Sequence, residues 1–310
     1  MRDYDVVVVG GGAAGLNAAL VLLRARRTVV LVDAGAPRNA PATHMHGFLS
    51  RDGMPPRELL AAGRSEVSGY GGSLIDDTVV GIEPGFHVRL ANGSQLGARR
   101  ILVATGLRDE LPDIPGVRER WGRDLLHCPY CHGYEVRDQP LGVLGGAPEA
   151  VQHALLMRQW SPDVTLFSHT GALTPEQREQ LTVRGIRIVE GRVARLVVDR
   201  DQLQGVELSD GTVVPRAVVF VRPRFVPNAD LLTGLGCAVD ENGWMVHDPA
   251  GRTSVAGVWV AGNAADPRAQ VITAAGQGSA AAIALNADLV DEDVESALAD
   301  HRTSHTARPA

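Results

Sequence analysis

The stretch VVVVGGGAAG, at residues 6–15, decides the fold of this chain. The valines belong to an expected strand, Tyr4–Val9, that runs straight into a glycine turn and a helix. In the pattern G-x-G-x-x-G, Gly10 allows a tight turn, Gly12 lets a pyrophosphate approach the backbone, and Gly15 lets helix and strand pack closely. N–H groups at the helix start suit an anion. The predicted pyrophosphate contacts are Gly10, Gly12, Ala13, Ala14 and Gly15.

A second strand is expected at Thr28–Val32, and it ends on Asp33. An acid about 20 residues after the glycine turn is typical of one that binds a ribose hydroxyl. Asp33, with its neighbour Ala34, is therefore expected to contact the same nucleotide. Strand, turn, helix, strand and acid follow in the order that a dinucleotide-binding βαβ unit requires.

The rest of the chain predicts a second unit of the same kind. Its strand is expected at 141–144, its glycine turn at 145–150, its helix up to 159 and its next strand at 164–167. We predict an α/β fold with two Rossmann-like (three-layer ββα) domains, the second inserted into the first. The first domain is assigned to residues 1–114 and 244–310, and the second domain, which carries the two nearby cysteines, to residues 115–243. The glycine motif alone does not separate FAD from NAD. Residues 300–310 are expected to be a frayed polar tail.

Composition excludes several classes of function. All 30 basic residues are Arg, so a Schiff-base lysine and a Walker lysine are impossible. The net charge is −6 and no block of like charge stands out, so we expect neither nucleic-acid binding nor a polybasic membrane patch. No apolar run is long enough for a signal or a membrane span. We expect a soluble, cytoplasmic protein.

The segment HCPYCH, at residues 127–132, is the centre of the functional argument. Cys128 and Cys131 can close a small disulfide ring, and a thiol near a helix start is acidified to the thiolate that attacks disulfides or flavin. His127 and His132 can move protons near neutral pH. Structural zinc would need a second ligand pair, and Cys237 is alone, so no metal is expected. Inert buried thiols are the other alternative.

The second glycine turn, Gly145–Ala150, departs from the fingerprint. Ala147 stands where a glycine would admit a pyrophosphate, and Pro148 lacks a backbone donor. No Arg that could hold a 2′-phosphate occurs between Gln159 and Glu176. Two interpretations stay open: a scaffold that no longer binds NADPH, which we favour, or weak binding of a nicotinamide cofactor such as NADH.

The C-terminal segment favours FAD at the first site. A strand ends on the turn at Gly262, and a helix rich in small residues begins near Gln270. Small residues let the backbone lie close to a flat ring, and a helix start stabilises charge on a reduced flavin. A tight helix–sheet contact is the alternative. The remaining predicted cofactor contacts are Asn39, His46, Thr105, Gly106, Gly262, Asn263, Gln270 and Val271.

These motifs, in this order, resemble the low-molecular-weight thioredoxin reductases along nearly the whole chain. The resemblance implies an FAD domain, an inserted NADPH-type domain and a homodimer. His132 and Asn263 replace two acids usual in that family, and its NADPH-binding arginines are missing. The segments CPYCHG and HMHGF are more similar to the gliotoxin- and holomycin-type dithiol oxidases. Those enzymes close a disulfide in a small natural product and pass the electrons to O2.

The resemblance implies a redox-active centre in which Cys131 lies against the flavin and Cys128 faces a small dithiol substrate. Electrons then pass to O2 and yield H2O2. His132 is the favoured base and His127 the second candidate. His44 and His46 line the flavin or substrate pocket or are ordinary loop residues. The main alternative is an NAD(P)H-dependent reductase of thioredoxin or a small disulfide, and a flavoprotein redox sensor without turnover is the third.

Overall fold

The computed structural model describes residues 2–306, which fall into two compact units. Unit 1 consists of the chain up to Ala40, Pro56–Arg108 and the chain from Pro227; unit 2 consists of Pro41–Pro55 and Asp109–Val226. The chain passes from one unit to the other within β7 (Leu107–Glu110) and again within β16 (Arg224–Pro227), and these two strands pair with each other. The boundaries predicted from the sequence, 114/115 and 243/244, lie after these strands. The loop Pro41–Pro55 packs with unit 2, which no local pattern in the sequence indicates.

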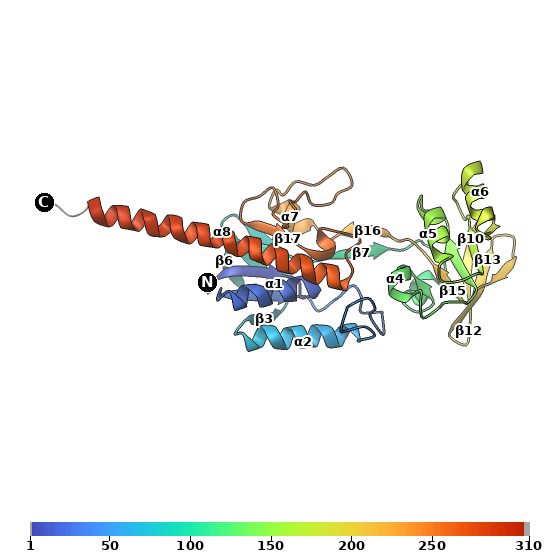
Figure 1. Cartoon of the computed structure of the whole chain (residues 1–310), viewed down its shortest axis with the longest axis horizontal. Coiled ribbons are helices and arrows are strands. Elements are labelled where there is room, and N and C mark those ends of the chain that lie inside the picture. The colour runs from blue at the N-terminus through green and yellow to red at the C-terminus, as the bar shows by residue number, and fades with distance from the viewer. Residues whose placement is uncertain (1, 307–310) are drawn as a thin grey trace. The chain divides into compact units, whose positions relative to one another are not determined.

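Unit 1 is built on one seven-stranded sheet with the order β3-β2-β1-β6-β5-β4, and β17 pairs with β6 (Figure 1). Strands β1, β2, β3, β6 and β17 are parallel where they pair, whereas β5 is antiparallel to β4 and β6. The bounds are β1 Arg2–Val9, β2 Val29–Asp33, β3 Ser73–Asp76, β4 Val79–Glu83, β5 His87–Leu90, β6 Gln95–Val103 and β17 Val258–Val260.

The four valines of β1 explain why this strand lies in the middle of the sheet. Val6 and Val8 belong to the core under helices α1 (Ala13–Arg24) and α8 (Val271–Thr306), whereas Val7 and Val9 belong to the core on the opposite face. Successive side chains of a strand point to opposite faces, so an uninterrupted apolar run is buried on both. The other helices of unit 1 are α2 (Pro56–Gly69), α7 (Asp230–Gly234) and the short 3-10 helix η1 (Gly262–Ala264).

Unit 2 has three layers. Its central parallel sheet has the order β11-β10-β9-β15-β8, a three-stranded antiparallel sheet β12-β13-β14 packs on one face, and α5 and α6 pack on the other. The bounds are α3 Val117–Arg120, β8 Leu125–Leu126, α4 Pro129–His132, β9 Leu141–Leu144, α5 Ala150–Met157, β10 Val164–Phe167, α6 Pro175–Val183, β11 Arg187–Val189, β12 Val193–Asp199, β13 Gln202–Leu208, β14 Val213–Pro215 and β15 Val218–Phe220. The predicted α/β class with Rossmann-like domains is confirmed.

The C-terminal segment is more ordered than the sequence suggested. Helix α8 continues to Thr306, so the prediction of a frayed tail from residue 300 is wrong up to that residue, and residues 307–310 lie outside the described chain. The hydroxyl of Ser304 donates to the carbonyl of Asp300 at 2.8 Å, one turn earlier, as a continuing helix allows. No helix among residues 2–306 has the length and apolarity needed to cross a membrane.

Candidate active site

The first glycine turn contains two kinds of glycine. A Cβ on Gly10, whose φ is +103°, would lie 2.4 Å from the carbonyl oxygen of Ala104, and one on Gly15 would lie 1.9 Å from that of Gly10. Both positions are therefore glycine because of the protein's own packing. A Cβ on Gly12 would meet no protein atom within 4 Å. The space in front of Gly12, at the start of α1, is therefore open for a ligand, and it fits the pyrophosphate of FAD.

Asp33 lies beside this turn, at the carboxyl end of β2. Its Oδ1 accepts a hydrogen bond from the N–H of Gly11 at 3.0 Å, and its Oδ2 lies 3.7 Å from Nη1 of Arg64. The acid therefore stabilises the turn and faces the same edge of the sheet. Its contact with a ribose, and that of Ala34, stay predictions.

The C-terminal segment packs directly on the glycine turn. A Cβ on Gly262 would lie 2.9 Å from the Cβ of Ala14, and one on Gly278, in α8, would lie 2.1 Å from the carbonyl oxygen of Ala14. The side chain of Gln277 accepts a hydrogen bond from the N–H of Gly262 at 3.2 Å. Tight packing therefore requires a small residue at Gly278 of α8, and it brings the predicted contact at Gly262 to the glycine turn. The contact of Val271 with the cofactor stays a prediction.

Asn263 and its neighbours form a hydrogen-bonded corner. Its Nδ2 donates to the carbonyls of Asp266 at 2.9 Å and Ala269 at 3.0 Å, and its Oδ1 accepts from Arg38 at 3.3 Å. The carbonyl of Gln270 begins α8 by accepting from the N–H of Ala274 at 2.8 Å. Asn263 thus fixes the approach to α8. The sequence analysis missed Arg38, because nothing local marks a contact across 225 residues.

Thr105 and Gly106 lie next to the same turn and are held by a residue that the sequence analysis also missed. Thr105 donates through Oγ1 to the carbonyl of Asn228 at 2.8 Å, and the side chain of Asn228 donates back to the carbonyl of Thr105 at 2.9 Å. The N–H of Asn228 donates to the carbonyl of Gly106 at 3.0 Å. Asn39 lies elsewhere, in the turn in which the N–H of Ala40 donates to the carbonyl of Pro37 at 3.0 Å.

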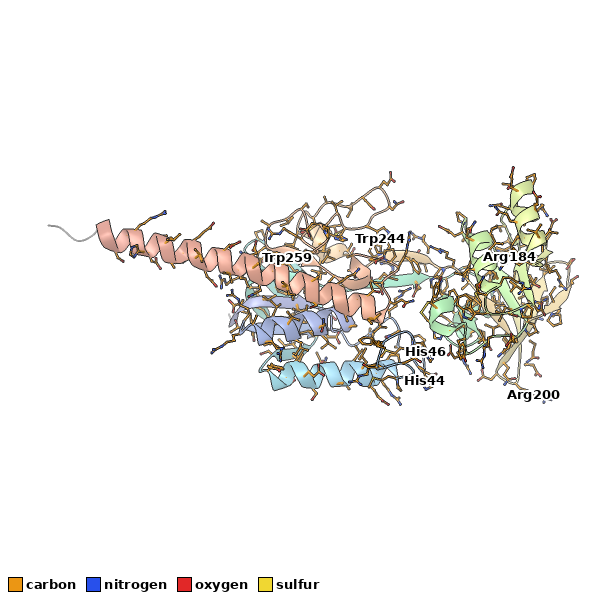
Figure 2. All side chains as sticks on the ribbon, in the orientation of Figure 1. His44, His46, Arg184, Arg200, Trp244 and Trp259 are labelled. Atoms are coloured by element: carbon orange, nitrogen blue, oxygen red, sulfur yellow. A yellow bond between two sulfur atoms is a disulfide. The ribbon has the colours of Figure 1, made fainter. Side chains whose placement is uncertain are left out.

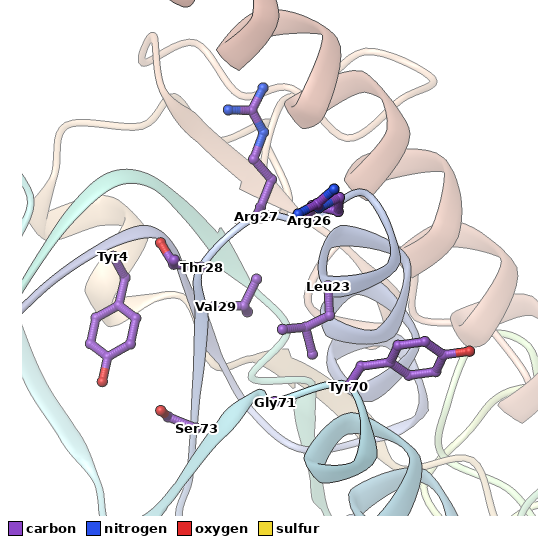
Figure 3. Close-up of a pocket in the computed structure, with 9 residues that line it drawn as sticks. All are labelled: Tyr4, Leu23, Arg26, Arg27, Thr28, Val29, Tyr70, Gly71 and Ser73. Atoms are coloured by element: carbon purple, nitrogen blue, oxygen red, sulfur yellow. The ribbon is translucent and has the colours of Figure 1, made fainter.

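A pocket of about 430 Å³ in unit 1 is a different feature (Figure 3). Its lining comes from the amino-terminal ends of the parallel strands and the segments before them: Tyr4, Leu23, Arg26, Arg27, Thr28, Val29, Tyr70, Gly71 and Ser73. In open α/β sheets, ligands bind beyond the carboxyl ends of the strands, where Gly12 and Asp33 lie. This pocket is therefore not the nucleotide site.

The predicted redox pair is a disulfide in unit 2. Cys128 and Cys131 are bonded to each other, with Cα atoms 5.2 Å apart, and Cys128 caps the start of α4. The chain is bent tightly here, because the N–H of His132 donates to the carbonyl of Cys128 at 3.2 Å. A Cβ on Gly133 would lie 2.9 Å from the ring of Trp160, so this glycine lets α4 pack on the tryptophan.

His132 follows the second cysteine directly. Burial is the largest influence on its pKa, which it lowers; the nearby charge of Glu135 raises the pKa and that of His46 lowers it. The net direction is down, so the imidazole is neutral at neutral pH and can accept a proton. This state suits the predicted general base.

His127, the second candidate base, packs against other rings of unit 2. Its Nδ1 lies 3.1 Å from the carbonyl oxygen of Val221, and its ring packs edge-on against Phe225 and His153. His153, in α5, is only 6% exposed, and burial, followed by the nearby charge of His127, lowers its pKa to about 4. His153 is therefore a neutral buried ring at neutral pH. The sequence analysis did not predict it as part of this cluster.

His46 lies on the loop Pro41–Pro55, as does His44 (Figure 2). Its Nε2 is 3.4 Å from Oε1 of Glu135, and its Nδ1 is 3.4 Å from Oδ2 of Asp52. The structure therefore brings His46 into the same unit as the disulfide and His132. Its predicted contact with the cofactor stays a prediction. His44 is exposed.

The second glycine turn is held by the protein itself. The N–H of Gly145 donates to the carbonyl of Phe167 at 2.7 Å, and a Cβ on Gly145 would lie 2.3 Å from that oxygen. Gly146 has a φ of +97°. Glu149 is the N-cap residue of α5 and makes no side-chain hydrogen bond to the helix start; it places an acidic group where a pyrophosphate would need positive charge, and it lies 3.7 Å from Arg222. Both retained glycines therefore have a structural reason.

The segment after β10 is also hydrogen-bonded within the protein. Nδ1 of His169 accepts a hydrogen bond from the N–H of Val193 at 3.0 Å, and burial, followed by the charge of Arg192, lowers its pKa. This is where an NADPH-binding unit would place cations for the 2′-phosphate. Among residues 2–306, no group of three or more His, Cys, Asp or Glu side chains is placed to hold a metal ion.

Unit 1 has a dinucleotide-type turn with open space at Gly12, and unit 2 carries a Cys-x-x-Cys disulfide. This combination is typical of flavoprotein disulfide oxidoreductases. The chain belongs to the pyridine nucleotide-disulphide oxidoreductase family, whose model matches residues 4–278. It is therefore a thioredoxin-reductase-like, FAD-dependent thiol/disulfide oxidoreductase, and the predicted recognition and enzyme class are confirmed.

Individual relatives agree with this assignment. A probable thioredoxin reductase from Arthroderma benhamiae is 31% identical over 98% of this chain and 85% of its own length. Thioredoxin reductase sirT from Leptosphaeria maculans is 30% identical over 94% of this chain and 96% of its own. Among solved structures, HlmI is 62% identical, covers 97% of both chains and superposes with a TM-score of 0.94.

Proposed function

We propose that this enzyme is a dithiol oxidase: it closes a disulfide in a small dithiol and passes the two electrons through FAD to O2, giving H2O2. The observation that carries the proposal is the disulfide Cys128–Cys131 beside a neutral His132, in a unit whose glycine turn has Ala147 in place of a fingerprint glycine and Pro148 without a backbone donor. An oxidase draws electrons from its substrate and has no need of NADPH. The segments CPYCHG and HMHGF, which resemble those of the dithiol oxidases, support this branch of the family.

The residues of unit 2 can perform the thiol chemistry in two balanced steps. A substrate thiol gives its proton to the imidazole of His132, and the resulting thiolate attacks Sγ of Cys128; the protein S–S bond breaks and Cys131 leaves as a thiolate. The second substrate thiol attacks the substrate sulfur of the mixed disulfide and gives its proton to the departing sulfur of Cys128, which is released as a thiol. The substrate has then lost two electrons and two protons, and the cysteine pair has gained the two electrons.

FAD, when bound, supplies the acceptor for these two electrons and their transfer to O2. Residues that fit its binding lie around the open space at Gly12: the glycine turn with Asp33, and the corner at Gly262 and Asn263 that leads into α8. The start of α8 can stabilise negative charge on a reduced ring.

The proposal is tested by anaerobic bleaching of the flavin absorbance. Dithiols such as dithiothreitol are expected to bleach the purified protein at a catalytic rate, whereas NADPH and NADH are not. Admission of air should restore the colour and produce H2O2 in proportion. Bleaching by either nicotinamide at a catalytic rate would instead establish the reductase.

The second candidate function is an NAD(P)H-dependent reductase of thioredoxin or a small disulfide. It is favoured by the names of the curated relatives above and by the βαβ unit that remains in unit 2.

A homodimer in the cytoplasm is a further part of our proposal, since the resemblance implies the dimer. Light scattering of the purified protein tests the assembly.

A further inference from the structure

Two imidazoles and two carboxylates form a cluster in unit 2, at the end of the short helix α4 that begins at Cys128. His132 is the last residue of α4, and Glu135 follows three residues later. His46 and Asp52 come from the loop Pro41–Pro55, far away in the sequence. The ring of His46 lies between the carboxylates of Asp52 and Glu135, at 3.4 Å from each.

The loop that carries His46 is folded. The N–H of Met45 donates to the carbonyl of Met54 at 3.0 Å, the N–H of Gly53 donates back to the carbonyl of Met45 at 2.9 Å, and the Met45 side chain is 5% exposed. A Cβ on Gly122 would lie 2.6 Å from the Cβ of Pro41, so the start of the loop packs closely on unit 2. His46 is therefore positioned by backbone pairing and burial, and only 22% of its side chain is exposed.

Glu135 is shared by the two imidazoles. The charged groups that face His132 are Glu135, which raises its pKa, and His46, which lowers it. His46 is faced by Asp52, Glu135 and His132. A negative charge on Glu135 stabilises the protonated form of His132, and a positive charge on His46 destabilises it. The two neighbours therefore act on His132 in opposite directions.

We propose that Glu135 and His46 are positioning residues that jointly set how readily His132 takes the proton of the substrate thiol. The inference rests on the proposed function, in which the S–H bond breaks, an N–H bond forms on His132, and the electron pair stays on the sulfur that attacks Cys128. The loop Pro41–Pro55 thus contributes to the pH range in which the enzyme activates thiols.

The experiment that tests this is an NMR titration of ¹³C-labelled histidines in the oxidised holoenzyme. The signal of His132 is identified by its loss in His132→Gln. Glu135→Gln should titrate His132 at lower pH than the wild type, and His46→Gln should titrate it at higher pH. Glu190→Gln is the matched control, because it removes an exposed carboxylate of unit 2 that pairs with Arg178, and it should leave the titration unchanged.

Activity gives a second reading of the same effect. The rate of anaerobic flavin bleaching by dithiothreitol should fall in acid, and the pH of this fall should move down in Glu135→Gln, move up in His46→Gln and stay near the wild-type value in Glu135→Asp. A merely structural role would lower the rate without these opposite movements.

The two hypotheses fail separately. Unmoved titrations of His132 in both variants, or movements in one direction only, would overturn the role of Glu135 and His46 while leaving the oxidase intact. Catalytic bleaching by NADPH would overturn the oxidase, and opposite movements of the His132 titration would still support the inference.

Discussion

The two glycine turns of this protein occupy equivalent places in two βαβ units, yet their glycines are retained for different reasons. In the first turn, Gly10 and Gly15 are required by packing, and Gly12 is not, since a Cβ there would meet nothing within 4 Å. In the second turn, Gly145 is required by packing, and the position equivalent to Gly12 holds Ala147.

The comparison teaches that a glycine pattern mixes two signals. Glycines that make the turn persist as long as the fold persists, because a side chain there would collide with the neighbouring strand. Our criterion for a ligand is therefore a glycine of the turn that has neither a packing contact nor a positive φ. By this criterion the first turn, with Gly12, keeps room for a nucleotide, whereas the second turn has Ala147 at that position and the acidic Glu149 as the N-cap residue of α5.

Unit 2 has a disulfide and an altered glycine turn, so we expect it to perform thiol chemistry. The largest effect is therefore expected when this disulfide is removed. Cys131→Ser should reduce turnover with dithiols to background, because the disulfide can no longer form, and leave the flavin bound, because the first turn is untouched. Absorbance of the purified variant and an oxygen-electrode assay measure both. Turnover at the wild-type rate would remove the redox pair from the mechanism.

A paired substitution breaks the first turn in two distinguishable ways. Gly12→Val should fill the open cradle, so that the protein folds but is purified without colour and is not reconstituted by FAD. Gly10→Ala should instead lower the free energy of unfolding by about 1–3 kcal/mol or more, because its Cβ would collide with Ala104. Denaturant unfolding and flavin content measure the pair. A yellow Gly12→Val protein would contradict the criterion.

The base in unit 2 predicts a smaller but measurable loss. His132→Gln should slow bleaching of the flavin by dithiols about 100-fold or more. Since burial lowers the pKa of His132, the neutral form is present at neutral pH, and the wild-type rate should fall as the pH drops through the lowered pKa of this imidazole. Stopped-flow rates across pH measure this. A variant that keeps the acid fall would point to His127 instead.

The smallest effects are expected at the second turn, where NADPH should not change the stability of the protein. Gly145→Ala should lower the free energy of unfolding by about 1–3 kcal/mol, because its Cβ would overlap the carbonyl oxygen of Phe167. NADPH should leave the melting temperature of the wild type unchanged, since a ligand that does not bind cannot stabilise the folded state. Differential scanning fluorimetry measures both. A rise in melting temperature with NADPH would restore the nucleotide site.

The fold could be read from the sequence where one local pattern carries the information. The valines followed by glycines predicted β1, the turn and α1, and the C-x-x-C spacing predicted the disulfide. Helix α2 was missed, because only two of its residues, Pro56 and Val67, are buried and its apolar pattern is correspondingly weak. The length of α8 was underestimated, because its last turns are polar.

The parts of the site that escaped prediction are contacts between distant segments. Asn228 holds the strand end at Thr105. His46 contacts Glu135 from a loop that is separated from it in the sequence by α2 and strands β3–β8. Neither contact has a spacing that a single sequence reveals. A loop with two histidines could be recognised as unusual, but its partner depends on which unit the loop packs against.

The contact between Gly278 and Ala14 links the cradle to helix α8. Gly278 is remote from the turn in sequence, yet a methyl group there would collide with the backbone of Ala14, a residue of the cradle itself. Because this collision is closer than the one expected at Gly10, even an alanine at position 278 would force α8 and the glycine turn apart. The shape of the cradle is thus expected to depend on a helix residue far outside the glycine motif.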